Sequence, residues 1–205
     1  MSSKRTSEGT PAHTAICLEA ERRKDGNMSE MLERILDDEN IKTAYKRVYA
    51  NKGAGGVDGV TTEELEEYMR VNWRSIKEQI RERKYNPQAV KRVEIPKPNG
   101  KTRPLGIPTI TDKIVQQCIL QVLEPICEAK FHERSNGFRP NRSAEHAIAQ
   151  CCKMIQTQHL YFVVDVDIKG FFDNVNHSKL IKQLWTMGVR DKKLLCIIKA
   201  MLKAP

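Results

Sequence analysis

The sequence of 205 residues predicts a helix-rich α+β protein with few strands. Apolar residues recur at helical spacing over most of the chain. The segment 90–95 alternates apolar and polar residues, and Tyr161-Phe-Val-Val164 is a continuous apolar run of strand length. Because 40% of the residues are hydrophobic, a real core can form, and the length suits one large domain or two small ones.

The first half of the chain predicts helices around a glycine-rich loop. Residues 1–27 are polar and basic without a sustained period, and we expect a mobile tail there. The stripes 32–36 and 41–48 predict two short helices, with Asn40 as the N-cap of the second. The segment 51–59 holds four glycines and predicts an irregular loop, after which the stripe 65–80 predicts a longer helix.

The second half begins with a predicted β-hairpin over 90–107, whose turn is Pro96-Lys-Pro-Asn-Gly-Lys101. Thr109 or Thr111 is expected to cap the following helix. The remaining expected elements are a loop at 135–141, a helix at 144–155, a strand at 161–164 that is covered on both faces, and helices at 177–187 and 191–202.

The net charge of +9 is unevenly distributed. Eight basic residues and only two acidic ones lie between Arg81 and Arg103, and a second basic cluster spans 130–142. Such a run is often just a solvated surface, but here prolines and glycines interleave with the basic residues. Loops of this kind present donors to an anion, so nucleic acid or a nucleotide is the first partner to consider.

Several protein classes are excluded. No apolar run approaches the roughly 18 residues that span a bilayer, and the first residues lack the apolar block of a secretory signal. The cysteines form no CxxC pair, which argues against a zinc ribbon, and no GxxxxGK[ST] loop is present. We therefore expect a soluble protein of the reducing cytoplasm.

Two carboxylates follow the predicted strand, at Asp165 and Asp167. Side chains repeat every two residues along a strand, so both carboxylates are expected on the same face. Mg²⁺ would relieve their repulsion, because it prefers hard oxygen ligands and substrate phosphates. The plain alternative is that one aspartate caps the next turn and the other is solvated.

The segment Asp167-Ile-Lys-Gly-Phe-Phe-Asp173 resembles motif A of template-copying polymerases, in the DIKxxFD form of reverse transcriptases. The resemblance implies that Asp167 is catalytic and binds the metal ions, together with the backbone carbonyl of Ile168. It also implies that Phe172 acts as a steric gate against a 2′-hydroxyl, and that Asp173 is structural.

Motifs upstream resemble group II intron reverse transcriptases. The segment 95–108 is similar to their fingers hairpin, which implies that Lys97 and Arg103 bind the triphosphate of the incoming nucleotide. Lys101 would either substitute for one of them or meet template phosphates. The segments 112–117 and 135–143 are similar to two further signatures, although Asn136 replaces an expected aromatic residue. Asn51-Lys-Gly-Ala-Gly-Gly-Val-Asp-Gly59 matches the N-K-G-x-x-G-x-D-G entry to the fingers. By this resemblance, the RNA-binding residues are Lys52, Lys101, Arg139 and Arg142.

The resemblance implies the fingers and partial palm of a right-hand polymerase, with the fingers at 28–150 and the start of the palm, carrying the motif A strand, at 151–205. The Tyr-Ala-Asp-Asp hairpin of the family does not occur in 174–205. We therefore expect a chain truncated before that hairpin, which binds RNA but is inactive as a polymerase by itself.

The implied function is that of a bacterial group II intron-encoded reverse transcriptase and maturase. Such an enzyme copies RNA into cDNA by two-metal nucleotidyl transfer with Mg²⁺ and assists intron splicing. Its expected partners are a template/primer duplex, intron RNA and dNTP, and apolar surface left by truncation would favour a homodimer. Two alternatives stay open: a purely RNA-binding splicing cofactor, and a related bacterial reverse transcriptase of a defence or other retroelement system.

Overall fold

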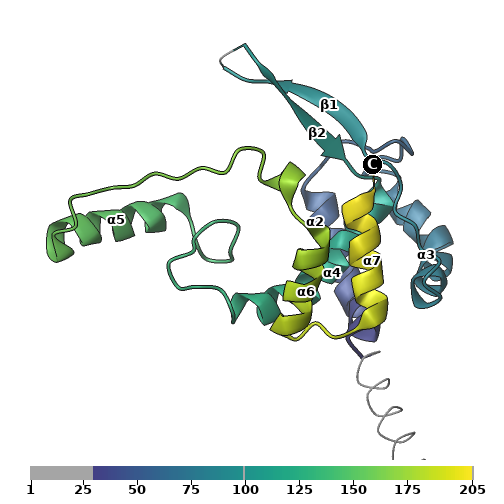
Figure 1. Ribbon diagram of the computed structural model, residues 1–205. Coiled ribbons are helices and arrows are strands. Elements are labelled where there is room, and N and C mark those ends of the chain that lie inside the picture. The colour runs from purple at the N-terminus through teal and green to yellow at the C-terminus, as the bar shows by residue number, and fades with distance from the viewer. Residues whose placement is uncertain (1–29, 99, 205) are drawn as a thin grey trace, which may run out of the picture. The chain divides into compact units, whose positions relative to one another are not determined.

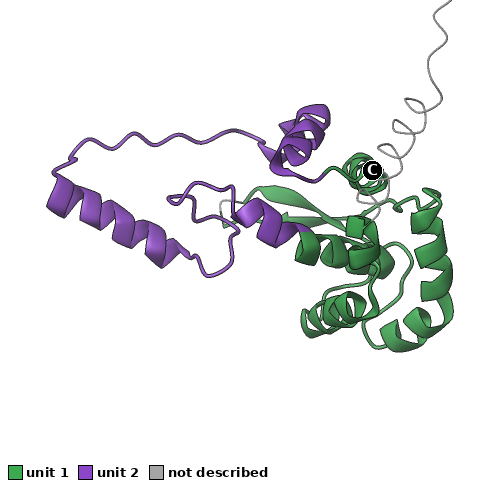
Figure 2. Cartoon of the chain, turned by 90° about the horizontal axis from the view of Figure 1, so that it is seen from below, with its two compact units in different colours: residues 1–122, 190–205 green, residues 123–189 purple. Residues whose placement is uncertain are grey.

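A computed structural model describes residues 30–98 and 100–204 of the chain. The predicted tail at 1–27 lies outside these described residues. The chain divides into two compact units (Figure 2): unit 1 comprises residues 1–122 and 190–205, and unit 2 comprises residues 123–189. The boundary between the units falls inside helix α4, Ile110–Glu128.

Unit 1 contains the core that the helical stripes predict. Its helices are the residues 30–35, α2 (Asp38–Ala50), α3 (Leu65–Arg81), the first part of α4, and α7 (Lys192–Lys203). The stripe positions are buried or half-buried in each of them, as expected for amphipathic helices around one core. The largest fully buried side chains of unit 1 are Leu32, Ile35, Leu65, Ile80, Ile110, Ile114, Leu194, Val115, Thr109 and Cys118.

The N-cap expected at Asn40 is wrong. Asp37 caps α2 instead, and its carboxylate accepts a hydrogen bond from the Glu39 backbone N–H at 3.0 Å. Asn40 lies inside the helix, where its amide donates to the carbonyls of Ile35 and Cys118 at 2.8 and 3.2 Å. The side chain therefore joins α2 to α4, which a local sequence pattern does not reveal.

A capping box fixes the start of α4. The hydroxyl of Thr109 accepts a hydrogen bond from the Asp112 N–H at 3.2 Å and donates to the Asp112 carboxylate at 2.7 Å. Asp112 is only 2% exposed and also accepts from the Tyr85 hydroxyl and the Gln88 N–H, at 2.5 and 3.1 Å. This confirms Thr109 as the capping residue. The same carboxylate connects the segment 85–88, which precedes the hairpin, with α4.

A second buried carboxylate connects the two ends of unit 1. Asp191 caps α7 by accepting from the N–H groups of Lys193 and Leu194 at 2.9 and 3.1 Å. Its other oxygen accepts from the Leu32 N–H at 3.1 Å, across 159 positions of sequence. One side chain therefore satisfies donors at the beginnings of two helices.

The hairpin forms as predicted (Figure 1). Strand β1 (Lys91–Pro96) pairs antiparallel with β2 (Thr102–Ile107), with Val93 opposite Leu105 and Ile95 opposite Arg103. The turn closes through hydrogen bonds from the Lys97 N–H to the Lys101 carbonyl at 2.6 Å and from the Gly100 N–H to the Lys97 carbonyl at 3.1 Å. Gly100 has φ +75°, the left-handed conformation that this three-residue turn requires.

Unit 2 contains α5 (Ala144–Gln158), the short 3-10 helix η1 (Phe172–Asn174) and α6 (His177–Met187). Ser143 and Asn176 cap α5 and α6, and Gly188 ends α6 with φ +112°. The helix expected at 144–155 is therefore present. Its apolar stripe is not covered, however, because no residue of α5 is buried.

The strand predicted at 161–164 is wrong. The chain between α5 and η1 runs as an extended coil without strand pairing (Figure 1). Phe162 is 98% exposed and Val164 is 85% exposed. An extended segment becomes a strand only where a neighbour pairs with its backbone groups, and β1 and β2 pair only with each other among the described residues.

The fold class is confirmed at the level of a helix-rich α+β chain with a two-stranded antiparallel sheet. Within residues 30–98 and 100–204, no helix combines the length and the apolar character needed to cross a bilayer.

Candidate nucleic-acid interface

The hairpin places on one face two residues that were predicted to bind a nucleotide. In the register of the strands, Arg103 lies opposite Ile95, and both share a face with Val93 and Leu105. Continuing the alternation by one residue places Lys97 on that face as well. Lys97 and Arg103 are exposed, so two cations extend from the apolar face near the tip of the hairpin.

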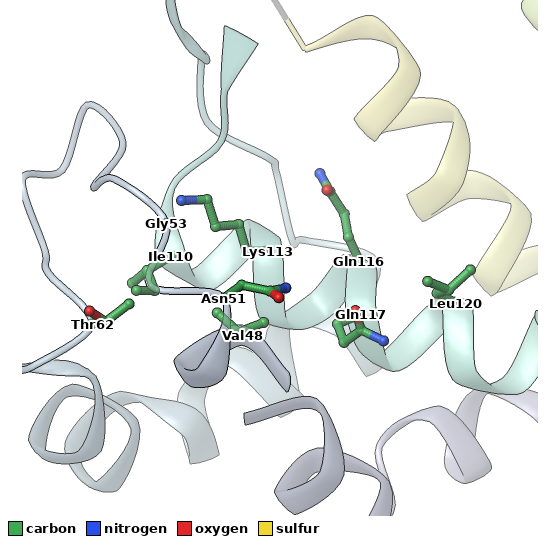
Figure 3. Close-up of a pocket in the computed structure, with 9 residues that line it drawn as sticks. All are labelled: Val48, Asn51, Gly53, Thr62, Ile110, Lys113, Gln116, Gln117 and Leu120. Carbon is green, nitrogen blue, oxygen red and sulfur yellow. The ribbon is translucent and has the colours of Figure 1, made fainter. Parts of the chain in front are cut away.

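A pocket lies beside the glycine-rich loop of unit 1 (Figure 3). Its volume is about 320 Å³. The side chains of Lys113, Gln116 and Gln117 come from α4, and Asn51 comes from the end of α2. Amide and ammonium groups dominate the polar lining, and such groups suit phosphates and base edges. Val48, Gly53, Thr62, Ile110 and Leu120 complete the lining.

Lys113 holds the glycine-rich loop against α4. Its ammonium donates to the Ala54 carbonyl at 2.5 Å. Partial burial lowers the pKa of Lys113, while the nearby Asp58 charge acts in the opposite direction. The amine therefore fixes the loop and also forms part of the pocket wall.

Close packing explains two of the loop glycines. A Cβ on Gly56 would lie 2.6 Å from the Thr109 Cα, and a Cβ on Gly55 would lie 2.8 Å from the Val60 carbonyl oxygen. The loop backbone can approach the start of α4 only because Gly56 has no side chain, and it can fold back on Val60 only because Gly55 has none. Lys52 stands exposed at the loop entrance with φ +44°.

The predicted site residues did not include Lys113, Gln116, Gln117 or Asn51. The segment 112–117 was recognised as a signature, but a linear pattern does not show that its polar residues face the loop 51–59. Only the packing of the loop on α4 brings the two segments together. Gly55 and Gly56 were the available signal, since adjacent glycines often mark a close backbone approach.

In unit 2, Arg139 is occupied within the protein. Its Nε donates to the Glu128 carboxylate at 2.9 Å, and its Nη1 donates to the carbonyls of His132 and Ser135 at 2.6 and 2.9 Å. The side chain is 6% exposed and its guanidinium lies 5.5 Å from the centroid of the Phe131 ring. An RNA contact by Arg139 stays a prediction, and in this structure the residue holds the loop 132–139 together.

The Arg139–Glu128 ion pair shifts the pKa of both side chains. The hydrogen bond from Arg139 lowers the pKa of Glu128, and the charges of Arg139 and Arg142 add to this effect. Arg142 makes no ion pair within the described chain and lines a second, polar pocket.

The residues predicted to form motif A lie in the exposed part of unit 2. Asp167 and Ile168 belong to the extended coil, and Phe172 begins η1 with its ring edge-on to Phe171, at 5.4 Å between centroids. Gly170, with φ +59°, accepts a hydrogen bond from the Asn174 N–H at 3.1 Å and so turns the chain into η1. No three His, Cys, Asp or Glu side chains of residues 30–98 and 100–204 gather as a metal site.

Comparison with known proteins places these features in a family. Residues 95–204 match the family described as reverse transcriptase (RNA-dependent DNA polymerase). Protein YkfC of Escherichia coli is 35% identical over 183 residues, which are 86% of this chain and 48% of YkfC.

Two further relatives are named for introns. The group II intron-encoded protein LtrA of Lactococcus lactis is 38% identical over 164 residues, which are 78% of this chain and 26% of LtrA. Nuclear intron maturase 2 of Arabidopsis thaliana is 35% identical over 94 residues, which are 46% of this chain and 12% of that protein. This chain therefore spans about half the length of YkfC and about a quarter of LtrA. Because the family match covers more than half of the chain, the chain belongs to the reverse transcriptase family and is homologous to group II intron-encoded proteins over most of its length.

Proposed function

We propose that this chain is part of a group II intron-type reverse transcriptase and maturase, which copies RNA into cDNA and assists splicing by binding intron RNA. In this proposal, residues 28–150 form the fingers and residues 151–205 begin the palm. Reverse transcriptases generally use divalent metal ions, and the relatives named for introns support an RNA partner.

The observation that carries the proposal is the hairpin face with Lys97 and Arg103. A transferring phosphoryl group needs cationic donors on its non-bridging oxygens. Two cations near the tip of a two-stranded hairpin can bind a triphosphate from one side. The neighbouring apolar side chains of Val93 and Leu105 provide a surface against which a base can pack.

The template is proposed to pass the glycine-rich loop. Lys52 and Lys101 would meet its phosphates, and Arg142 would contact RNA from unit 2. Arg139 could add a phosphate contact only if its bonds to Glu128 and to the two carbonyls opened. Its proposed role is therefore mainly to position the loop that leads to Arg142.

Asp167 is the proposed catalytic carboxylate, with Ile168 supplying a backbone carbonyl for Mg²⁺. No three metal-binding side chains gather among the described residues, and the proposal takes the remaining ligands from the Tyr-Ala-Asp-Asp hairpin of the family in a longer protein. Phe172 is the proposed sugar gate. Its ring is exposed and would pack against the position of a ribose 2′-carbon rather than against a protein core.

Primer extension tests the polymerase role in a longer protein that contains this segment and the remaining palm. Asp167→Asn should abolish cDNA synthesis while leaving RNA affinity within about twofold. Asp173→Asn is the control, since that aspartate is proposed to be structural rather than a metal ligand. Retained synthesis in the Asp167 variant would disprove the metal assignment.

The same assay tests the sugar gate. Phe172→Ala should allow the enzyme to incorporate ribonucleotides, and unchanged sugar selectivity would disprove the assignment of Phe172 as the gate.

RNA binding tests the splicing role with the 205-residue chain itself. Filter binding to structured intron RNA and to a random RNA of equal length, over a salt series, separates specific from general binding. A preference for the intron RNA that persists at high salt would support the maturase role. Equal and steeply salt-sensitive binding would leave only a template-binding surface in this chain.

A further inference from the structure

Unit 2 contains a polar pocket of about 340 Å³ that the motifs do not explain. It lies between the loop after α4 and one face of α5. The charged and amide side chains that line it are Glu133, Arg134, Arg142, Gln150, Lys153 and Gln158. Only Arg142 among these belongs to a recognised signature.

Three cations of this pocket make no direct contact with an acceptor of the protein. The side chains of Arg134, Arg142 and Lys153 form no ion pair or hydrogen bond within the described chain. Arg139 provides the contrast, because its guanidinium is bound to Glu128 and to two carbonyls a few residues away. The lining holds these three cations and one carboxylate, Glu133, so positive charge is in excess there, and an anion in the pocket would relieve the repulsion among the cations.

Gln150 adds an oriented amide. Its Oε1 accepts a hydrogen bond from the Asn136 side chain at 3.2 Å. The acceptor end is thereby engaged with the loop, and the two Nε2 donors remain uncommitted. Gln150 and Lys153 are three positions apart on α5, so they lie on the same face of the helix.

The donors and the single acid fit a nucleotide unit of RNA. Two guanidinium groups, one ammonium and one amide can surround the oxygens of a phosphate. Glu133 is the one carboxylate in the lining, and it cannot bind phosphate, but it can accept a hydrogen bond from a ribose 2′-hydroxyl.

We propose that the pocket lined by Arg134, Arg142, Gln150 and Lys153 binds a backbone phosphate of an RNA strand, with Glu133 accepting from the adjacent 2′-hydroxyl. This inference rests on the proposed function only in taking RNA as the ligand. It assigns a contact to unit 2 that is separate from the hairpin and from motif A.

Fluorescence anisotropy of the 205-residue chain with a labelled RNA oligonucleotide tests the phosphate contact. Lys153→Ala should weaken RNA binding about fivefold and reduce the salt slope by about 0.7. Lys182→Ala is the matched control, since Lys182 is an exposed, unpaired lysine on α6 outside the pocket. Equal losses for the two variants would overturn the proposal. No RNA binding by the unaltered chain would instead contradict the proposed function.

Chemical footprinting gives a readout that needs no substitution. An amine-reactive reagent should modify Lys153 more slowly when RNA is bound, while the modification rate of Lys182 stays unchanged. Equal protection of both lysines would contradict a localised contact. Inorganic phosphate at millimolar concentration should not reproduce the protection; if it did, the site would be one for free phosphate rather than for an RNA strand.

The ribose contact is tested with RNA and DNA of the same sequence. The chain should prefer RNA, and Glu133→Gln should reduce the ratio of the two affinities severalfold while leaving phosphate binding in place. A ratio that does not change in Glu133→Gln would overturn the assignment of Glu133.

Discussion

Gly56 and Gly53 occupy the same loop but tolerate a side chain very differently. A Cβ at Gly56 would meet backbone atoms of Thr109 and Pro108 at 2.6 to 2.8 Å. A Cβ at Gly53 would meet only the Lys113 ammonium, at 3.5 Å. The first contact requires the backbone to move, whereas the second is an ordinary van der Waals distance.

We therefore expect Gly56→Ala to lower the free energy of unfolding by about 2 kcal/mol, a typical cost of overpacking. Gly53→Ala should change it by less than about 0.5 kcal/mol. Urea denaturation of both variants checks the difference. Equal destabilisation would mean that the loop does not pack on the start of α4.

Arg139 differs from its neighbours because its donors are used internally. We expect Arg139→Ala to lower the unfolding temperature by several degrees at pH 7, since Glu128 and the carbonyls of His132 and Ser135 lose their partner. Arg134→Ala, which removes an unpaired exposed cation, is the control and should change the unfolding temperature little. A similar drop in the unfolding temperature of both variants would show that the contacts of Arg139 do not stabilise the fold.

The Arg139 effect should also depend on pH. The pKa of Glu128 is lowered in the folded state, so the ion pair stabilises the fold above the ordinary glutamate value of 4.5. Its contribution is lost as the pH falls through the lowered folded value. The difference in unfolding temperature between the natural chain and Arg139→Ala should therefore shrink below about pH 4.5. A constant difference down to pH 2 would contradict the ion pair.

At the scale of elements, the two faces of the hairpin separate two arginines. Arg103 lies on the face with Ile95, whereas Arg92 lies opposite Gly106 on the other face. In a polymerase that contains this segment, Arg103→Ala should raise the KM for dNTP about tenfold, because a charge-assisted contact is lost. Arg92→Ala removes the same charge from the other face and should leave KM within about twofold. Equal increases would reject the face assignment.

Helices with similar apolar stripes have different surroundings in this chain. The stripes of α3 and α7 are buried in unit 1, while the stripe of α5 is exposed in unit 2. The amphipathic pattern predicts a helix in each case because local spacing determines it. Whether the apolar face is covered depends on which other elements pack against it, and the spacing carries no information about that.

At the scale of the whole molecule, the two units should differ in how well their backbone amides are protected from hydrogen exchange. Residues 161–169 donate no backbone hydrogen bond and are exposed. Their amides should exchange with solvent hydrogen within seconds, whereas those of α4 around Ile114 should be protected by several orders of magnitude. Hydrogen–deuterium exchange followed by mass spectrometry of the 205-residue chain measures both.

The same experiment at several protein concentrations addresses the predicted homodimer. Protection of 161–169 that increases with concentration would mean that a second copy pairs with this segment. Fast exchange at every concentration would mean that the segment stays unpaired in the chain alone. A longer protein with more of the palm should then protect it.

Parts of the candidate site were accessible from sequence. The roles of Lys97 and Arg103 were predicted from the resemblance to a fingers hairpin and stay predictions, whereas the hairpin and its turn are local, so strand alternation places both side chains on one face. Lys113, Asn51 and the pocket around Lys153 were missed, since each depends on two segments meeting in space. Arg139 was recognised as a basic residue of a signature, but its partner Glu128 is visible only in the fold.

The sequence by itself determined the helix spacing, the hairpin and its glycine turn, and the family to which the chain belongs. These properties depend on residues that are neighbours along the chain. The tertiary structure decided that Asp191 binds the Leu32 N–H, that Gly56 packs on Thr109, and that the apolar run 161–164 is not a strand. Each of these depends on contacts between distant segments, and a strand in particular needs a partner for its backbone groups.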